Sequence, residues 1–327
     1  MPHSLLVIDE HYADCYRDRI REKFPDVTVH TALTREQVGE EVREVEAIWG
    51  IGTQRIFGND MVGRAQRLRW IQAFTTGTDG ILALPSLKKD VVVTSMRGIH
   101  GPQMSEHAFL FMIGLARDFP RIVRNQAKAA WERFDQVRVF GKTVAILGVG
   151  IVGADLAARC KACGMQVIGV TRTIRAMDNF DRMVTYAELE QAARAADFLV
   201  VIAPHSAQTD KIVSARVLAA MKRSAFLINI SRGGVCDEDA LAQALRDKRI
   251  AGAGLDVFET EPLPADHPFW RMERVMVTPH MGGSSDFAPG LQMEILEHNL
   301  RCFLEGRLSD MVNIVQGAGT RLSGPGR

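Results

Sequence analysis

The segment at residues 142–171, KTVAILGVGIVGADLAARCKACGMQVIGVT, restricts the possible fold of this chain more than any other. An apolar run at 143–147 leads into Gly148, Gly150 and Gly153, which have the spacing G-x-G-x-x-G, and an Ala-rich stretch with helical periodicity follows. In such a turn the first glycine permits the tight bend, the second lets phosphates approach the backbone, and the third lets helix and strand pack closely. The segment therefore predicts a strand, turn and helix that bind a dinucleotide, with its pyrophosphate at the helix N-terminus.

Short apolar runs alternate with helix-like segments along the rest of the chain, and this alternation predicts parallel sheets covered by helices. The expected strands are Leu5–Asp9, Val27–His30, Ala47–Gly50, Trp70–Phe74 and Val91–Thr94, then six more at Thr143–Leu147, Gln166–Thr171, Phe198–Ala203, Phe226–Ile230, Gly252–Val257 and Val275–Thr278. The expected helices are YADCYRDRIREKF, REQVGEEVREV, NDMVGRAQRL, His100–Arg117 and FAPGLQMEILEHNLRCFLEG, with a short extended piece at VNIV. The later six strands are what a full dinucleotide-binding domain requires.

The chain of 327 residues is too long for one ordinary domain, and its 46% of hydrophobic residues can form large cores. Because no run of strands follows the last helix pattern, we expect that helix to pack back on the first domain, which makes the second domain an insertion. The predicted fold class is α/β, with two Rossmann- or flavodoxin-like doubly wound parallel sheets. The expected boundaries are a substrate (catalytic) domain at 1–99 and 285–315, a dinucleotide-binding domain at 100–284, and a disordered tail at 316–327.

Charge and cysteine content argue against several classes of protein. The net charge of +1 gives no electrostatic reason to bind nucleic acid or an acidic membrane surface, and no apolar run is long enough to span a membrane. The five cysteines, an odd number, indicate reduced thiols and a cytoplasmic location. Cys160 and Cys163 form a CxxC, but they lie in a helical pattern without a second Cys/His pair, so we expect buried helical thiols and no metal site.

Three polar residues, Arg232, Glu261 and His280, each follow a different predicted strand. Because ligands of open α/β sheets bind at the carboxyl ends of the strands, we expect these residues to converge in one crevice. An arginine fork suits a carboxylate and an adjacent carbonyl oxygen, a histidine exchanges a proton near neutral pH, and a neighbouring carboxylate favours the imidazolium. Together they predict the reduction of a 2-oxo acid, although each alone has an ordinary explanation as a surface ion pair, a loop acid or a capped core histidine.

The residues after the second strand of the glycine unit predict which nicotinamide cofactor is used. An acid at this place suits the free 2′-hydroxyl of NAD(H), but the chain has Thr171, Arg172, Thr173 and Arg175. A guanidinium matches a 2′-phosphate well, and the threonine hydroxyls could add hydrogen bonds. We therefore expect NADP(H) to be preferred and NAD(H) to be possible. The alternative is that Arg172 stacks on the adenine or points to solvent.

Four stretches, LGVGIVG, LINISRGGVCDEDAL, AGAGLDVFETEP and VTPHMGGSS, resemble the D-isomer-specific 2-hydroxyacid dehydrogenase family in their order and spacing, and the similarity extends to about Val315. The resemblance implies two flavodoxin-like or Rossmann-like domains around a cleft, usually in a homodimer. It also implies an NAD(P)-dependent enzyme that acts on a small 2-oxo or 2-hydroxy acid, with Arg232, Glu261 and His280 as the catalytic residues.

The same resemblance implies a set of binding residues. Asp256 falls on the family's acid near the nicotinamide carboxamide, and Pro204 on the residue after its third cofactor strand. The other expected cofactor residues are Gly148, Gly150, Ile151, Val152, Gly153, Thr171, Arg172, Thr173, Arg175, Ala203 and Ile230. The expected substrate residues besides Arg232 and His280 are Ile51, Gly77 and Thr78, the last two through backbone amides of the loop TTGTDG.

Particular residues separate the branches of this family. Glu261 stands where the resembling formate dehydrogenases have glutamine, and the loop GIGT at 50–53 lacks the arginine usual in phosphoglycerate enzymes. We therefore favour the glyoxylate/hydroxypyruvate reductase branch, while phosphonate dehydrogenases and enzymes for bulkier 2-oxo acids stay open. A further alternative is a dinucleotide-sensing co-regulator that binds peptides, against which the short tail of this chain argues.

Four aromatic residues outside these motifs have less specific interpretations. His107 is expected to be a packing or capping residue of its helix. His205 either contacts the cofactor or has only a loop role. Trp131 either reaches toward the partner subunit or packs in a dimer, and Trp270 either borders the active-site cleft or anchors its loop.

Overall fold

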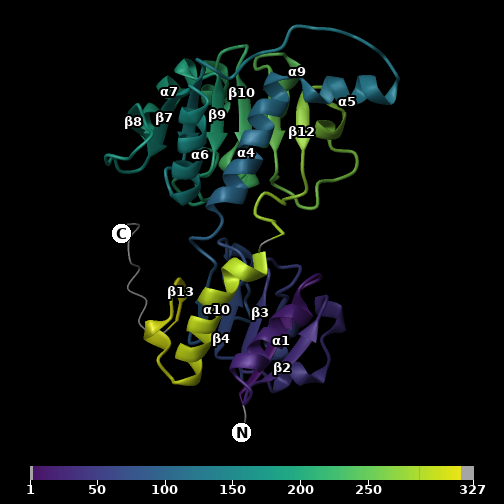
Figure 1. Cartoon of the computed structure of the whole chain (residues 1–327), viewed down its shortest axis with the longest axis vertical. Helices are drawn as coiled ribbons and strands as arrows, with labels where there is room; N and C mark the ends of the chain where they lie inside the picture. The colour runs from purple at the N-terminus through teal and green to yellow at the C-terminus, as the bar shows by residue number, and fades with distance from the viewer. Residues whose placement is uncertain (1–2, 287, 318–327) are drawn as a thin grey trace. The chain divides into compact units, whose positions relative to one another are not determined.

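The computed structural model describes residues 3–286 and 288–317 (Figure 1). The chain forms two compact units, one made of Met1–Ile99 with Ser285–Arg327 and the other of His100–Ser284. Each is an α/β unit with its own largely parallel sheet, so the predicted fold class is confirmed. The roles of the two units as substrate domain and dinucleotide-binding domain stay predictions, and residues 318–327 of the expected tail lie outside the described residues.

The sheet of the first unit has the strand order β13-β5-β4-β3-β1-β2, in which β13 is the antiparallel member of the described strands. The order β2-β1-β3-β4-β5 is that of flavodoxin-like sheets, which bind ligands at the carboxyl ends of their strands. The strands are β1 (Ser4–Ile8), β2 (Thr28–Ala32), β3 (Ala47–Gly50), β4 (Trp70–Ala73), β5 (Val92–Thr94) and β13 (Ile314–Gln316). The helices are α1 (Ala13–Lys23), α2 (Asn59–Arg64), α3 (Asp79–Leu82) and α10 (Ala288–Leu304), with 3-10 turns η1 (Arg35–Gln37), η2 (Glu40–Arg43) and η6 (Leu308–Asp310).

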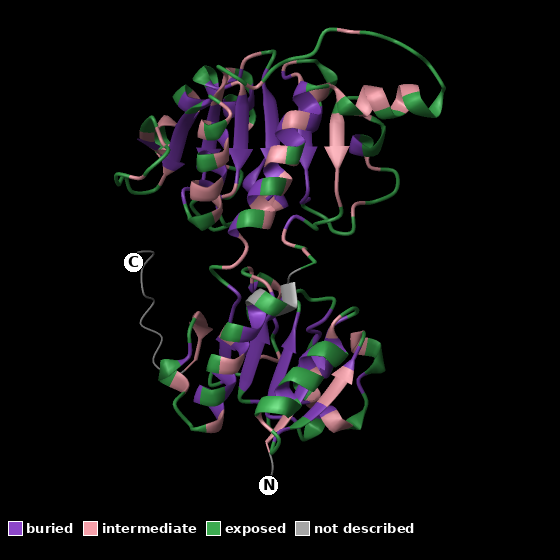
Figure 2. Cartoon of the chain, viewed as in Figure 1, coloured by how far each residue is buried: buried purple, intermediate pink, exposed green. Residues whose placement is uncertain are grey.

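Apolar side chains cover both faces of this sheet. On one face, α1 and α10 lie side by side (Figure 1), and Tyr16, Trp49, Trp70 and Phe303 are buried beneath them. On the other face, side chains such as Met61 of α2 pack against the strands. The strands are therefore buried while the outer faces of the helices stay exposed (Figure 2), as expected for a doubly wound sheet.

Two expectations for the first unit are wrong in detail. The segment REQVGEEVREV does not form one helix but the two turns η1 and η2, and Gly39 between them has an extended backbone (φ −85°, ψ −151°). Glycine is a poor helix former, so it ends the pattern there. Strand β13 follows α10 and pairs with β5, so Gln316 belongs to the sheet and not to a disordered tail.

The sheet of the second unit has the strand order β12-β11-β10-β9-β6-β7-β8, with all neighbours parallel. Its strands are β6 (Thr143–Leu147), β7 (Gln166–Thr171), β8 (Arg182–Thr185), β9 (Phe198–Val201), β10 (Phe226–Asn229), β11 (Gly252–Leu255) and β12 (Val275–Val277). The α-helices are α4 (Gly101–Ala116), α5 (Phe119–Ala127), α6 (Ile151–Ala162), α7 (Leu189–Ala195), α8 (Ala215–Ala220) and α9 (Glu238–Arg246). The 3-10 turns are η3 (Tyr186–Glu188), η4 (Gly233–Val235) and η5 (Pro268–Arg271).

Among the described residues this sheet has seven strands, not the six that were expected, because the sequence analysis did not predict β8. Strand β8 is the edge strand beside β7, where Thr171 pairs with Thr185. Its sequence RMVT is short and half-exposed, so it lacks the apolar run that marks a buried strand. With β8 included, the order β8-β7-β6-β9-β10-β11 is that of a dinucleotide-binding sheet, and β12 extends it by one strand.

Two helical layers cover the faces of the second sheet. Helices α4 and α6 pack together over one face, and α7, α8 and α9 contribute to the core on the other. Cys160 of α6 is buried as expected, whereas Cys163 is only half-buried. No helix within the described residues is long and apolar enough to cross a membrane. The same residues contain no group of three or more His, Cys, Asp or Glu side chains that could hold a metal ion.

Candidate active site

The loops at the carboxyl edge of the second sheet carry most of the predicted site residues. Because its seven described strands are parallel, these loops all lie on the same edge. In strand order from β12 to β7 the edge carries His280, then Asp256 and Glu261 after β11, Arg232 after β10, Pro204 after β9, the glycine turn after β6, and residues 171–175 at β7. The topology therefore places the candidate catalytic groups at one end of the edge and the candidate nucleotide groups at the other.

Each of the three positions in the turn after β6 is occupied by glycine for a different structural reason. Gly148 has a φ of +109°, and a Cβ there would lie 2.5 Å from the backbone nitrogen of Ala203. A Cβ on Gly153 would lie 2.3 Å from the carbonyl oxygen of Gly148, so α6 packs directly on the turn. At Gly150, just before α6, no described atom lies within 4 Å of the Cβ position. Two crowded glycines thus shape the turn, and the open one leaves room for phosphates at the helix N-terminus.

Two guanidinium groups lie near this turn. Strand β7 ends at Thr171, and Arg172 after it is exposed. Burial raises the pKa of Tyr186, and the positive charge of Arg172 acts against that shift. Arg175 folds back toward the glycine turn, where its Nη2 donates a hydrogen bond to the carbonyl oxygen of Val149 at 2.8 Å. The end of β7 therefore carries positive charge beside the turn.

The backbone of Arg232 is held by hydrogen bonds of the Asn229 side chain at the end of β10. Asn229, which is buried, accepts hydrogen bonds from the amide (3.1 Å) and the hydroxyl (3.0 Å) of Ser231. Its Nδ2 donates to the carbonyl oxygen of Arg232 at 3.0 Å. A Cβ on Gly233 would lie 2.0 Å from the carbonyl carbon of Phe258, so the loop packs tightly on the one after β11. The backbone of Arg232 is thus fixed while its half-buried side chain stands at the edge.

Glu261 and His280 form a hydrogen-bonded pair, with Oε2 of Glu261 2.7 Å from Nδ1 of His280. Burial favours a higher pKa for Glu261, but the bond to His280, the amide of Phe258 and the charge of Arg232 together hold that pKa below its usual value. An ionised carboxylate only accepts hydrogen bonds, so Nδ1 of His280 carries a hydrogen and Nε2 is the nitrogen that can exchange a proton. The two side chains are 35% and 41% exposed, so a ligand can reach them.

Asp256 holds the loop that carries His280. Its carboxylate, 1% exposed, accepts hydrogen bonds from the hydroxyl of Thr278 (2.6 Å) and from the amides of residues 281–282 (2.9 Å each). Its carbonyl oxygen accepts the amide of His280 at 2.8 Å. Burial would raise the pKa of Asp256, but these donors and His107 lower it to about 2. His280 has a φ of +51°, a strained value for a residue with a Cβ, and these bonds over-determine it.

The remaining predicted cofactor residues of this unit lie along the same edge. Ala203 and Ile230 are buried at the ends of β9 and β10, while Pro204 and Thr173 are exposed. The residues that open α6, Ile151 and Val152, follow the glycine turn directly. Their contacts with a cofactor stay predictions.

The structure decides some of the less specific interpretations. Nε1 of Trp270 donates to the carbonyl oxygen of Pro264 at 2.9 Å, so this side chain anchors its own loop. His205 lies 2.8 Å from Asp210, and its ring covers Gly234 next to the Arg232 loop.

The predicted substrate residues of the first unit lie at the carboxyl edge of their own sheet. Ile51, 38% exposed, follows β3, and Gly77 and Thr78 follow β4. The hydroxyl of Thr75 joins the two loops, because it accepts the amide of Gly52 (3.1 Å) and donates to the carbonyl oxygen of Gly77 (2.6 Å). Within the described chain, the amides of Gly77 and Thr78 donate no hydrogen bond, so they are available to an anion. Their role in substrate binding stays a prediction.

Three residues that hold the site were missed or set aside from the sequence. Asn229 is a polar residue at the end of an apolar strand, and Thr278 stands two positions before His280, so both had a weak signal. Nε2 of His107 lies 2.9 Å from the hydroxyl oxygen of Thr278, a contact that the expected packing or capping role did not include. The sequence separation of these two residues, 171 positions, leaves no local pattern that could reveal their contact.

Comparison with known proteins identifies the family. The family model for the NAD-binding domain of D-isomer specific 2-hydroxyacid dehydrogenases matches residues 109–282. The chain is 31% identical to a glyoxylate reductase of Korarchaeum cryptofilum, over 99% of this chain and 95% of that protein. It is 28% identical to a D-3-phosphoglycerate dehydrogenase of Methanocaldococcus jannaschii over 94% of this chain, but it spans only 59% of the length of that relative.

A solved structure agrees with these relatives. The NADPH-dependent glyoxylate/hydroxypyruvate reductase from Sinorhizobium meliloti, in complex with NADP and sulfate, is 26% identical to this chain and matches it with a TM-score of 0.79. The match covers 95% of this chain and 98% of that one. These findings confirm the resemblance seen in the sequence motifs. The chain therefore belongs to the D-isomer-specific 2-hydroxyacid dehydrogenase family and is an enzyme of its NAD(P)-dependent dehydrogenase class.

Proposed function

We propose that this protein reduces a small 2-oxo acid to the D-2-hydroxy acid. The observation that carries the proposal is that Arg232 and the hydrogen-bonded pair of Glu261 and His280 share one sheet edge with the glycine turn. The nicotinamide cofactor, when bound, supplies the hydride for the carbonyl carbon. The test follows nicotinamide absorbance with a panel of glyoxylate, hydroxypyruvate and phenylpyruvate as oxidants. Failure to turn over any of them contradicts the proposal.

The residues divide the remaining chemistry among them. The guanidinium of Arg232 binds the substrate carboxylate and polarises the ketone. His280 gives the proton on Nε2 to the ketone oxygen, because its Nδ1 is bound to Glu261. Ionised Glu261 orients the ring and favours the imidazolium. In this proposal the unit His100–Ser284 binds the dinucleotide, and the amides of Gly77 and Thr78 in the other unit bind the substrate carboxylate.

The proposed substrates are glyoxylate and hydroxypyruvate. The loop at 50–53 has no arginine for a substrate phosphate. The Korarchaeum relative is named a glyoxylate reductase, and the Sinorhizobium neighbour a glyoxylate/hydroxypyruvate reductase. Measuring kcat/KM for the panel, with phosphite oxidation as a further assay, tests this choice. A higher kcat/KM for phenylpyruvate or for phosphite would contradict it.

The proposed cofactor is NADP(H). Arg172 and Arg175 place positive charge beside the glycine turn, and residues 171–175 include no acid to repel a 2′-phosphate. The hydrogen bond of Arg175 to the carbonyl oxygen of Val149 holds its guanidinium toward the turn. The ratio of kcat/KM for NADPH to that for NADH, at fixed substrate, measures the preference. Equal or better use of NADH contradicts this part of the proposal and leaves the reductase assignment standing.

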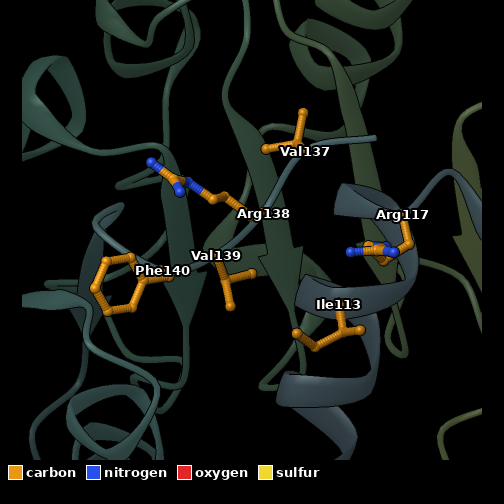
Figure 3. Close-up of a pocket in the computed structure, with 6 residues that line it drawn as sticks. All are labelled: Ile113, Arg117, Val137, Arg138, Val139 and Phe140. Atoms are coloured by element: carbon orange, nitrogen blue, oxygen red, sulfur yellow. The ribbon is translucent and has the colours of Figure 1, made fainter. Parts of the chain in front are cut away.

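We also infer a homodimer from exposed apolar side chains near α5. The segment between α5 and β6 forms a long loop around the outside of the second unit (Figure 1), and Trp131 in it is 97% exposed. Phe119 and Val123 of α5 are 49% and 47% exposed, and Phe140, at the end of the loop before β6, is 63% exposed. A cavity of about 280 Å³ at this place is lined by residues of α4 and of the loop (Figure 3): Ile113, Arg117, Val137, Arg138, Val139 and Phe140.

Covering these side chains with a second copy would remove a large apolar surface from water. Light scattering of the purified chain tests the inference, and replacement of Trp131 by serine is expected to weaken the dimer. A wild-type protein that is monomeric at micromolar concentration contradicts it.

A further inference from the structure

His107 lies on the inner face of α4 and contacts the loop that carries His280. Its side chain is 12% exposed, and its ring stands edge-on to that of Phe111 with 4.8 Å between the ring centroids. Its Nε2 lies 2.9 Å from the hydroxyl oxygen of Thr278 and 3.4 Å from Oδ1 of Asp256. His107 therefore links helix α4 to two polar side chains next to the candidate active site, those of Thr278 and Asp256.

The direction of the hydrogen bonds follows from simple proton counting. The carboxylate of Asp256 is ionised and only accepts. The hydroxyl of Thr278 therefore donates its one hydrogen to Asp256, at 2.6 Å. Its oxygen can then only accept from His107, so Nε2 of His107 must carry a hydrogen. The three side chains form a one-way series in which His107 donates to Thr278 and Thr278 donates to Asp256.

The far end of this series binds the loop on both sides of His280. The carbonyl oxygen of Asp256 accepts the amide of His280, and its carboxylate accepts the amides of residues 281–282. The loop has no space to move toward α4, because a Cβ on Gly282 would lie 2.9 Å from Oδ2 of Asp256 and 3.3 Å from Cδ2 of His107. Hydrogen bonds to Asp256 thus hold the backbone that positions the His280 ring. Asp256 is itself held by the hydrogen bonds that run from His107 through Thr278.

We propose that His107 is a positioning residue, which acts through Thr278 and Asp256 to hold His280 against Glu261. This inference rests on the proposed function, since it assigns a support for the proton donor of that same site. His107 itself needs no contact with substrate or cofactor. The competing explanation is that His107 only fills space beside Phe111.

Matched variants separate the hydrogen bond from the packing. His107→Phe keeps a ring but removes the donor, and Thr278→Val keeps the shape but removes the hydroxyl. We expect each to lower kcat for 2-oxo acid reduction by about tenfold to hundredfold, with the KM for NADPH little changed, because small displacements of a catalytic group cost rates of this size. His107→Gln and Thr278→Ser, which keep a donor, should recover most of the activity. The double variant should lose no more than the worse single one, because both break the same series.

A control variant measures what a merely structural change does. Asp197 also binds backbone and a side chain, because it accepts the amide of Thr143 (2.9 Å) and Nζ of Lys222 (3.0 Å). It lies at the amino ends of β6 and β9, on the opposite edge of the sheet. We expect Asp197→Asn to lower the urea midpoint of unfolding and leave kcat unchanged. If His107→Phe loses stability like this control but keeps its kcat, the positioning role is wrong.

A second readout does not depend on turnover. In the full chain with ¹⁵N-labelled histidine, nuclear magnetic resonance should show His107 with a hydrogen on Nε2, and His107→Phe or Thr278→Val should shift the ring signals of His280. A His107 ring protonated only at Nδ1, or His280 signals that neither variant moves, overturns the inference. If the chain reduces no 2-oxo acid but these signals behave as expected, the proposed function fails while the hydrogen-bond series stands.

Discussion

The two ends of one sheet edge are built differently. At the β10–β12 end the backbone of two proposed catalytic residues is held by a buried polar side chain: Asn229 fixes the Arg232 loop, and Asp256 fixes the His280 loop. At the β7 end Arg172 is exposed, and Arg175, also exposed, donates hydrogen bonds to the carbonyl oxygen of Val149 and to the sulfur of Met177. The end with the proposed catalytic residues is therefore held by buried hydrogen bonds, whereas the end proposed to select the cofactor has a few surface charges.

Because the two ends differ, we expect a substitution at the β10–β12 end to change the rate and one at the β7 end to change only the choice of cofactor. Groups that transfer protons must be placed to within a fraction of an ångström. The accuracy that buried hydrogen bonds provide therefore outweighs the free-energy cost of removing their polar groups from water. A guanidinium that recognises a phosphate acts over a longer range and tolerates a mobile side chain. We therefore expect large losses of kcat at the β10–β12 end and smaller, separable effects on cofactor preference at the β7 end.

The largest effect is expected from the loss of the proton donor. Replacing His280 by asparagine removes the general acid and should lower kcat by about 10²- to 10⁴-fold. Binding of NADPH, measured by fluorescence titration, should stay near that of the wild type because His280 is not part of the glycine turn. A kcat within about threefold of the wild type would remove His280 from the mechanism.

Arg232→Ala should have the next largest effect. A lost charge-assisted hydrogen bond costs about 1.5–3 kcal/mol, or roughly one to two decades in kcat/KM. The loss should appear with every carboxylate substrate, while NADPH binding is little affected. Arg246→Ala, at the end of α9, is the control and should behave as the wild type. An Arg232→Ala enzyme with normal kcat/KM would contradict the assigned substrate contact.

The same comparison shows how far the sequence alone could lead. Glycine spacing and strand ends carry strong local signals, so the α/β class, the glycine turn and the position of Arg232, Glu261 and His280 on one edge could all be predicted. The hydrogen bond between His107 and Thr278, next to the His280 loop, joins residues 171 positions apart in the sequence. Such contacts depend on the exact packing of α4 on the sheet and leave no periodic signature.

The errors of sequence interpretation also have physical causes. Strand β8 is a half-exposed edge strand with only one fully buried side chain, so its composition looks like a loop. The segment around Gly39 has helical spacing of apolar residues, but the glycine breaks it into two turns. Both errors lie away from Arg232, Glu261 and His280, so the strand ends that carry these residues could still be predicted.

At the β7 end, exchanging two residues should change the cofactor and not the chemistry. Thr171→Asp combined with Arg172→Ser adds a charge that repels the 2′-phosphate and removes one that attracts it. If Arg172 supplies one charged hydrogen-bond pair, the wild-type preference for NADPH is roughly tenfold to hundredfold, and the double variant should invert it. The maximal kcat with the better cofactor should stay within about threefold. A drop in kcat with both cofactors would show that the two ends of the edge are not separable.

The smallest expected effect is a shift in pH dependence, and it tests the pairing of Glu261 with His280. Their hydrogen bond and the charge of Arg232 lower the pKa of Glu261, so its charge is present above the usual carboxyl range and is lost only as pH falls through the lowered value. Near neutral pH this charge favours the imidazolium that reduction requires. Glu261→Gln keeps the shape and removes the charge, so the alkaline limb of reduction should move to lower pH by about one unit or more.

The same shift should have opposite effects on reduction and on oxidation. Oxidation of the hydroxy acid needs the neutral ring, so its limb should move the same way and the reverse reaction should gain activity at lower pH. Glu259→Gln is the matched control, because Glu259 lies in the same loop but pairs with Lys211 at 3.2 Å. Its profile should stay that of the wild type. If both variants shift equally, the effect comes from the net charge of the loop, and if Glu261→Gln leaves the profile unmoved, the short bond to His280 does not set the protonation of the ring.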